Sequence, residues 1–283
     1  MNVIITGSNG QLGKEFKKYF DKNKINYTAT DKFDFDITNL EQMNKFIDKN
    51  RNKNISHIIN CAAYTNVDES EINFKKAYLI NSFAVKNLVE ISKKINSELI
   101  HFSTDYVFSG DKETYNTNDI TNPINNYGKS KAFGEKELKK YNKSYLIRTS
   151  WLFGKNGNNF IKKVINWSEK TNVLKIATDE KSSPTYTLDL VKFTNELINK
   201  GMFGTYHITN SACTRYEWAE YILKKIGWKG ELLKAKRDDF KLKAKRPPKS
   251  VLNNYKINKV IGRKMPDWEN ATDRFLKELG YIV

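Results

Sequence analysis

The segment Val3-Ile-Ile-Thr-Gly7-Ser-Asn-Gly10-Gln11-Leu12-Gly13 decides the fold predicted for this chain. Four β-branched residues run into three glycines, and apolar residues at helical spacing follow, so the segment reads as strand, turn and helix. Glycine at such a turn lets backbone N–H groups and a helix N-terminus approach a pyrophosphate. The segment therefore predicts a dinucleotide site, with an ordinary glycine-rich turn as the alternative. The candidate cofactor contacts here are Gly7, Gly10, Gln11, Leu12 and Gly13.

Strand and helix signals alternate over the first 150 residues. Strands are expected near 3–6, 26–31, 57–63, 99–103 and 146–149, and helices near 11–20, 38–47, 69–80, 82–95 and 128–141. A capping box, Thr38-Asn-Leu-Glu41, is expected to open the second helix. Alternation of this kind predicts an α/β fold, a Rossmann-like doubly wound parallel sheet covered on both faces.

The pattern loosens after residue 150. Helices are expected near 158–170, 187–199, 214–226 and 267–279, with strands near 173–177 and 204–208. A capping box at Thr214–Glu217 opens the third of these helices. We expect an NAD(P)-binding domain over residues 1–150, with segments near 179–200 returning to it. Residues 151–283 are expected to form a smaller α/β substrate-binding cap.

Composition excludes several classes of protein. The 283 residues carry 49 Lys+Arg against 32 Asp+Glu, a net charge of +17, yet 39% are hydrophobic, so the charge does not indicate disorder. The lysines are scattered, which favours a solvated basic face over a nucleic-acid site, and an acidic small-molecule substrate is a third interpretation. The chain has neither a membrane span nor a signal peptide by sequence, and it has only two cysteines. We therefore expect a cytoplasmic protein without nucleic-acid or membrane partners.

Further cofactor candidates follow the second and third strands. A carboxylate at Asp31 would accept hydrogen bonds from a ribose 2′-OH and favour NADH, whereas Lys32 would suit the 2′-phosphate of NADPH, so both cofactors stay open. A turn-capping Asp is the other interpretation of Asp31. Asp36-Ile37 is placed to meet the adenine, and Ala62-Ala63 ends a strand with side chains small enough for close approach of a ligand.

A candidate chemical site lies at Tyr127-Gly-Lys-Ser-Lys131. Residues four apart share one helical face, and a cation one turn away favours a phenolate, so Lys131 is expected to bring the pKa of Tyr127 down toward neutrality. The spacing alone is weak in a chain rich in both residues, but this copy follows a strand that ends Phe102-Ser-Thr104-Asp105. Because that strand end lies at the ligand-binding edge of a parallel sheet, Thr104 could donate to a substrate carbonyl beside Tyr127.

Together these motifs resemble the extended short-chain dehydrogenases/reductases. More narrowly, segments along nearly the whole chain are similar to the dTDP-4-dehydrorhamnose reductase family. The segments that carry the resemblance are 7–13, 60–71, 103–108, 126–131, 148–153, 183–185 and 246–252.

The resemblance implies an activity and a set of roles. The reaction is reduction of the C4 keto group of dTDP-4-dehydro-L-rhamnose by NADPH or NADH, giving dTDP-L-rhamnose for surface polysaccharide. Tyr127 would be the general acid, Lys131 would tune it and bind the nicotinamide ribose, and Thr104 would polarise the carbonyl. The other implied cofactor contacts are Tyr64, Phe102 and Asn81, the last supporting a proton-relay water. The implied substrate contacts are Thr104, Asp105, Tyr106, Trp151, Arg246 and Ser250.

One departure from the family concerns a metal. Some members bind Mg²⁺ through acidic residues at a dimer contact, and Glu15 matches the first of these. The later acidic pair is not evident, since Tyr186-Thr-Leu-Asp189 stands there, so no metal ligand is predicted. A homodimer remains compatible with the resemblance.

Two alternatives differ in function. One is a reductase or epimerase acting on another nucleotide-linked keto-deoxysugar. The other is a non-catalytic NADP-binding regulatory subunit, against which the intact Thr104, Tyr127 and Lys131 argue.

Overall fold

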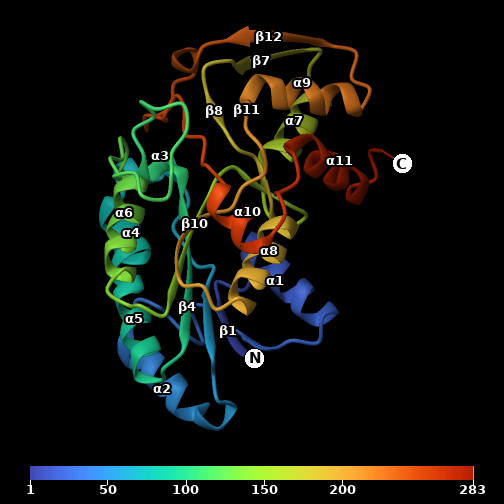
Figure 1. Ribbon diagram of the computed structural model, residues 1–283. Coiled ribbons are helices and arrows are strands. Elements are labelled where there is room, and N and C mark those ends of the chain that lie inside the picture. Colours follow the sequence, from blue (N-terminus) through green and yellow to red (C-terminus); the bar gives the residue numbers. More distant parts are fainter. Residues whose placement is uncertain (283) are drawn as a thin grey trace.

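A six-stranded parallel sheet lies at the centre of the molecule, described over residues 1–282 by a computed structural model (Figure 1). The strands run in the order β2-β1-β3-β4-β5-β10, so the order reverses between β1 and β3. Ligands of open α/β sheets bind at such a reversal, beyond the carboxyl ends of the strands. The predicted fold class is confirmed. The strands are β1 Asn2–Thr6, β2 Asn26–Ala29, β3 His57–Asn60, β4 Glu98–Thr104, β5 Ser144–Thr149 and β10 Gly204–His207.

Helices cover both faces of this sheet (Figure 1). On one face α1 (Gln11–Lys22) packs against α8 (Thr187–Asn199), which also contacts α10 (Tyr255–Ile261). On the other face lie α2 (Leu40–Lys49), α5 (Ala84–Lys94) and α6 (Asn126–Leu138). The chain after residue 150 thus returns α8, β10 and α10 to the central unit.

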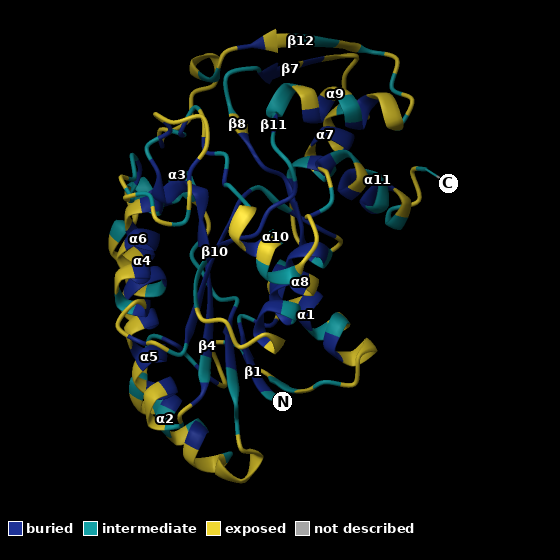
Figure 2. Cartoon of the chain, viewed as in Figure 1, coloured by how far each residue is buried: buried dark blue, intermediate teal, exposed yellow. Residues whose placement is uncertain are grey.

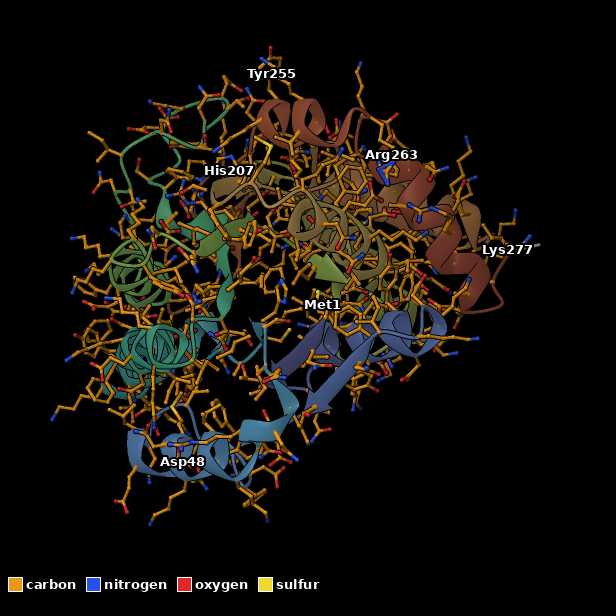
Figure 3. All side chains as sticks on the ribbon, turned by 60° about the horizontal axis from the view of Figure 1, so that its bottom comes forward. Met1, Asp48, His207, Tyr255, Arg263 and Lys277 are labelled. Atoms are coloured by element: carbon orange, nitrogen blue, oxygen red, sulfur yellow. The ribbon has the colours of Figure 1, made fainter. Side chains whose placement is uncertain are left out.

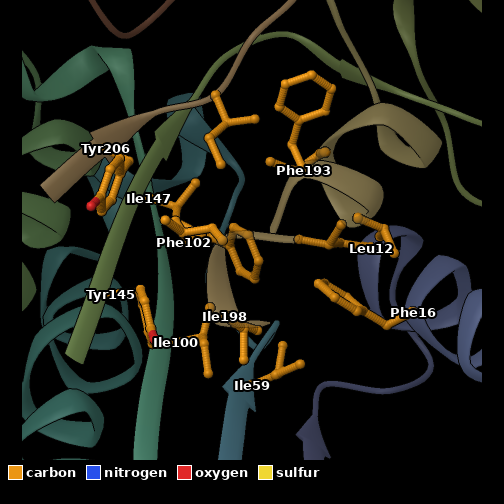
Figure 4. Close-up of a cluster of buried hydrophobic side chains, with 14 of the residues drawn as sticks. Leu12, Phe16, Ile59, Ile100, Phe102, Tyr145, Ile147, Phe193, Ile198 and Tyr206 are labelled. Carbon is orange, nitrogen blue, oxygen red and sulfur yellow. The ribbon is translucent and has the colours of Figure 1, made fainter. Parts of the chain in front are cut away.

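Side chains of successive strand residues pack into two separate hydrophobic cores. Ile5 of β1 and Ile59 of β3 belong to the cluster under α1 and α8, while their neighbours Ile4 and Ile58 belong to the cluster under α2 and α5. Figure 4 shows part of the first cluster, and Figure 2 shows the central strands of the sheet as largely buried. Burial on both faces explains why these strands read as continuous apolar runs rather than alternating ones.

The cap forms the top of the molecule in Figure 1. Its two-stranded sheet pairs β7 (Val173–Ala177) with β12 (Glu231–Ala235) in parallel, and a third core forms around the buried Trp218. β12 was not predicted, because most of its residues are exposed or half-buried and show no apolar pattern. The other cap elements are α7 Phe160–Ser168, α9 Arg215–Lys225, α11 Trp268–Glu278, and the short pairs β6 Leu152–Phe153 with β9 Thr185–Tyr186 and β8 Lys181–Ser182 with β11 Cys213–Thr214.

Local structure differs from the sequence expectation in three places. The cap of α2 is Asn39, whose side chain accepts from Gln42 N, so the box expected at Thr38 is wrong; the Thr38 hydroxyl instead donates to Asp36. The two helices expected over 69–95 are α3 (Val67–Ile72), α4 (Phe74–Tyr78), a π-helical turn η2 (Leu79–Phe83) and α5. Strand β2 ends at Ala29, two residues before Asp31. The box at Thr214 and Glu217 is confirmed.

The charged side chains surround the molecule instead of gathering on one face. In Figure 3 side chains with nitrogen ends project all round the outline, the exposed Lys277 among them, while His207 lies inside. Residues 1–282 include no helix that combines the length and the apolar character needed to span a bilayer.

Candidate active site

The turn between β1 and α1 lies directly against the chain that leaves β3. Gly7 has a φ of +61°, a left-handed conformation that glycine adopts without strain. A Cβ there would lie 2.6 Å from Ala62 N, so a side chain would also collide with the neighbouring backbone. The glycine turn therefore lies at the point where the strand order reverses.

A cavity of about 470 Å³ opens at this point. Nine predicted site residues line it: Gly10, Gln11, Leu12, Ala63, Phe102, Thr104, Tyr127, Lys131 and Trp151. Other lining residues were not predicted, namely Cys61, Thr65, Ser103, Thr149, Ser150, Leu152, Gly157 and Asn158. Thr149 is the last residue of β5 and Ser150 follows it, at the same edge of the sheet, so their position relative to the strand could have predicted them. Gly157 and Asn158 reach the cavity from the cap, which no local pattern indicates.

Two buried polar atoms in the cavity wall have no hydrogen-bond partner within residues 1–282. They are Thr149 Oγ1 and Trp151 Nε1. Buried polar groups of proteins are almost always paired, so an unpaired hydroxyl and an unpaired indole N–H in residues of the cavity wall are unusual and favour a polar ligand nearby. With the glycine turn in the wall of the same cavity, the residues present fit a dinucleotide cofactor together with a polar substrate.

The start of α6 is held against the end of β4. A Cβ at Gly128 would overlap the carbonyl oxygen of Tyr106, so only glycine permits this approach. The Asn125 side chain caps the helix by accepting from Gly128 N at 2.7 Å and donates to Lys245 O of the later chain at 2.8 Å. These contacts place Tyr127 beside Thr104.

The pKa of Tyr127 moves opposite to the sequence expectation. Removal from water raises it to about 12, and the neighbouring Thr104 hydroxyl only partly opposes the shift. Lys131 is itself buried, which lowers its pKa to about 8, and its Nζ donates to Phe102 O at 2.6 Å. The expected depression was wrong because burial of both groups outweighs their proximity. A phenol that stays protonated at neutral pH suits the role of proton donor.

Asp105 ties the end of β4 to two distant segments. Its carboxylate accepts from the hydroxyls of Thr104 at 3.0 Å, Ser182 at 2.9 Å and Ser250 at 2.5 Å. Burial raises the pKa of Asp105 to about 6, and these three hydroxyls oppose the rise. Because the Thr104 hydrogen points to Asp105, its oxygen is left to accept, as it does from Tyr106 N at 3.2 Å.

Other predicted substrate contacts have partners inside the protein. Arg246 donates in a fork to Asp68 of α3, at 2.7 and 2.6 Å, and lines a second cavity of about 310 Å³ beside Arg237. Ser250 is the Asp105 partner described above. Tyr106 packs edge-on against Tyr127, with ring centres 6.1 Å apart. Their roles toward a substrate stay predictions.

Other predicted cofactor residues do not line the cavity. Asn81, in η2, donates to Tyr64 O and Ser130 Oγ, both at 2.9 Å. Asp31 accepts from Asn9 Nδ2 at 3.2 Å and from Phe33 N at 2.8 Å. Asp36 accepts from Thr38, and the side chain of Ile37 lies in the core under α2 and α5.

The acidic residues near Glu15 do not form a metal site. Glu15 is buried, accepts from Thr187 Oγ1 at 3.2 Å and has Lys18 as a charged neighbour. The Arg274 guanidinium donates two hydrogen bonds to the Asp189 carboxylate, at 2.8 and 2.5 Å. Over residues 1–282 no group of three or more His, Cys, Asp or Glu side chains is placed to hold a metal ion.

Similarity to known proteins agrees with this geometry. The sequence profile described as RmlD substrate binding domain matches residues 1–281. A dTDP-4-dehydrorhamnose reductase from Aggregatibacter actinomycetemcomitans is 36% identical over 285 residues, covering 95% of this chain and 96% of that protein. The chain belongs to the dTDP-4-dehydrorhamnose reductase family. The resemblance seen in the sequence motifs is confirmed.

Two further relatives bear on cofactor and substrate. The crystal structure of a dTDP-4-dehydrorhamnose reductase from Bacillus anthracis in complex with NADP has a TM-score of 0.93 and 37% identity, covering 98% of this chain and 99% of that one. A dTDP-4-keto-6-deoxy-D-glucose reductase from Streptomyces niveus is 30% identical over 228 residues, covering 79% of this chain and 78% of that protein. The reductase family thus includes a relative named for a different keto-sugar.

Proposed function

We propose that the chain reduces the C4 keto group of dTDP-4-dehydro-L-rhamnose to give dTDP-L-rhamnose, as an NAD(P)H-dependent oxidoreductase of surface polysaccharide biosynthesis. The observation that carries the proposal is the cavity in which Thr104, Tyr127 and Lys131 meet the glycine turn, in a chain of this family. The NADP complex of the B. anthracis relative supports the cofactor class.

The site residues have separate roles in the reduction. A bound reduced nicotinamide supplies the hydride. Tyr127, protonated at neutral pH, gives its hydroxyl proton to the oxygen that becomes negative at C4. Lys131, one turn along the same helix face, stabilises the phenolate left behind when it carries its charge. Trp151, which lines the cavity, contacts the substrate.

Cofactor choice depends on the surroundings of Asp31. Both carboxylate oxygens of Asp31 already accept hydrogen bonds, yet its charge would still repel a 2′-phosphate. Lys32 is exposed beside it and could pair with that phosphate. We propose that NADPH and NADH both serve, and comparison of kcat/KM for the two cofactors measures the preference.

We also propose a cytoplasmic homodimer that binds nucleotide sugar and neither nucleic acid nor membrane. The dimer is supported by exposed apolar side chains on neighbouring elements, since contiguous apolar patches mark protein contacts. They are Ile72, Tyr78, Leu79, Phe83 and Phe133. Light scattering after gel filtration measures the mass. For the domains, we propose that residues 1–150 with α8, β10 and α10 form the cofactor-binding unit and that the rest of 151–283 forms the cap.

The decisive experiment follows reduced-nicotinamide absorbance with dTDP-4-dehydrorhamnose as substrate. We expect Tyr127→Phe to lower kcat about 100-fold or more, as removal of a general acid does. The exposed Tyr255, also in lysine-rich sequence, supplies the matched control, because Tyr255→Phe should leave kcat unchanged. A Tyr127→Phe enzyme with full activity would refute the mechanism.

A second candidate substrate is dTDP-4-keto-6-deoxy-D-glucose, favoured by the S. niveus relative. The same assay with both sugars at equal concentration separates the two. Turnover of only the second sugar would replace the proposed substrate. Tight NADPH binding without turnover of either would favour a regulatory subunit.

A further inference from the structure

A buried chain of hydrogen bonds leads from the end of β3 to the amine of Lys131. Asn60 Oδ1 accepts from Thr6 Oγ1 at 2.7 Å and from Ala62 N at 3.2 Å. Asn60 Nδ2 lies 2.9 Å from His101 Nδ1, and His101 Nε2 lies 3.4 Å from Lys131 Nζ. Both Asn60 and His101 are almost completely buried. Neither Asn60 nor His101 lines the cavity that contains Thr104 and Tyr127.

The directions of these bonds are set by one backbone group. The Ala62 N–H can only donate, so the amide oxygen of Asn60 must face it and the amide nitrogen must face His101. An amide nitrogen only donates, so His101 Nδ1 accepts and the ring proton is on Nε2. Burial, and then the Lys131 charge, keep the pKa of His101 well below its usual value, so the ring is neutral. His101 Nε2–H therefore faces Lys131 Nζ.

We propose that His101 is a positioning residue for the reductase reaction, whose Nε2–H donates to the lone pair of Lys131 Nζ and disfavours the ammonium form of that lysine. An ammonium has no lone pair, so it would meet the Nε2–H as donor against donor. If the ring proton moved to Nδ1, it would face the Asn60 amide nitrogen, again donor against donor. Asn60 cannot turn its amide to relieve this, because its oxygen must accept from Ala62 N–H. The proposal rests on the proposed function through the role given to Lys131.

The other groups around Lys131 act differently. Glu135, one turn along α6, favours the ammonium, while burial disfavours it more and lowers the pKa of Lys131 to about 8. Phe102 O accepts a hydrogen from either form, and the Tyr127 phenol is neutral. His101 is thus the one neighbour described here whose hydrogen bond distinguishes the two forms. Its effect is to keep the lysine proton exchangeable close to working pH.

The test measures the titration of Lys131 directly in the ligand-free enzyme. Lysine labelled with ¹³C at Cε gives an NMR signal that moves on protonation, and Lys131→Met identifies the signal by its loss. We expect a midpoint near pH 8 in the natural chain. In His101→Met, which removes the N–H, the midpoint should rise by about one pH unit or more, which is a tenfold change in proton affinity. In His101→Gln, whose amide N–H replaces Nε2–H, it should stay within about half a unit.

Two further variants keep the test decisive. Asn60→Leu leaves His101 and Lys131 in place but lets the ring proton move to Nδ1, so Nε2 can accept from the ammonium. The Lys131 midpoint should therefore rise, as in His101→Met. This variant tests the proposal even if His101→Met does not fold. His57→Met changes a histidine at the opposite end of neighbouring β3 and should leave the midpoint unchanged. Unchanged midpoints in His101→Met and Asn60→Leu would overturn the proposal.

The pH profile of kcat/KM for the nucleotide sugar gives the second readout. Its alkaline limb should move upward with the NMR midpoint in His101→Met, whereas a purely structural loss would lower the rate at every pH. If the NMR midpoints move as expected but no nucleotide sugar is reduced, the effect of His101 on the Lys131 proton stands, and only its role in the reductase reaction fails with the proposed function.

Discussion

Two Arg–Glu pairs in this protein are both held by two hydrogen bonds but differ in burial, and their comparison gives a quantitative prediction. Arg148 forks onto Glu135 with distances of 2.9 and 2.6 Å, and the side chains are 1% and 2% exposed. Arg263 forks onto Glu196 with distances of 3.1 and 2.6 Å, and the side chains are 46% and 39% exposed. Figure 3 labels Arg263 among the helices of the C-terminal region.

Glu135→Gln leaves the Arg148 charge buried without a counter-charge. The cost of breaking a buried pair in this way is about 3–5 kcal/mol in the free energy of unfolding. Glu196→Gln should cost only about 0–1 kcal/mol, because water solvates the exposed Arg263. The Ser103 hydroxyl and Arg148 Nε can still donate to the glutamine oxygen, but the glutamine amide nitrogen then faces Arg148 Nη2 as donor against donor, so one hydrogen bond is lost together with the charge.

Urea unfolding of the two variants beside the natural chain measures these losses, provided that the slopes agree. In 1 M salt the small Glu196→Gln effect should disappear, while the Glu135→Gln effect should persist because salt does not reach the buried pair. Replacing both buried partners, as Glu135→Leu with Arg148→Met, should recover much of the loss. Equal losses for Glu135→Gln and Glu196→Gln would refute the reasoning.

Three other predictions concern the site. Because the pKa of Asp105 is raised to about 6, the native state holds a proton that the unfolded chain releases between about pH 4 and 6. The free energy of unfolding should therefore fall by up to about 3 kcal/mol as pH rises over that window, and Asp105→Asn should abolish this slope in urea titrations. Gly128→Ala should displace Tyr127 and lower kcat about tenfold or more; an unchanged kcat would contradict the tight packing on Tyr106. Asp31→Ala should raise kcat/KM for NADPH relative to NADH about tenfold, and an unchanged ratio would show that Asp31 only shapes the turn.

Much of the fold was predictable because its signals are local. The glycine turn, the strands buried on both faces and helices such as α8 each depend on residues close in sequence, whose periodicity reflects the secondary structure itself. The errors occurred where neighbouring side chains compete for the same role or where tertiary packing decides. The cap of α2 is Asn39 and not Thr38, since Asp36 holds the Thr38 hydroxyl. β12 forms because β7 lies beside it, not because its own sequence demands a strand.

The sequence by itself determined the fold class and the family, and it predicted the residues proposed to carry the chemistry: the glycine turn, Thr104, Tyr127 and Lys131. Only the tertiary structure decided the protonation and the hydrogen-bond partners of the site residues. Asp105 meets Ser182 and Ser250 from 77 and 145 residues away, and Arg246 meets Asp68 from 178 residues away. The pKa values of Tyr127 and Lys131 follow from burial, which is a property of the packed molecule. A motif identifies a side chain, whereas its protonation and hydrogen-bond direction depend on neighbours that folding brings together.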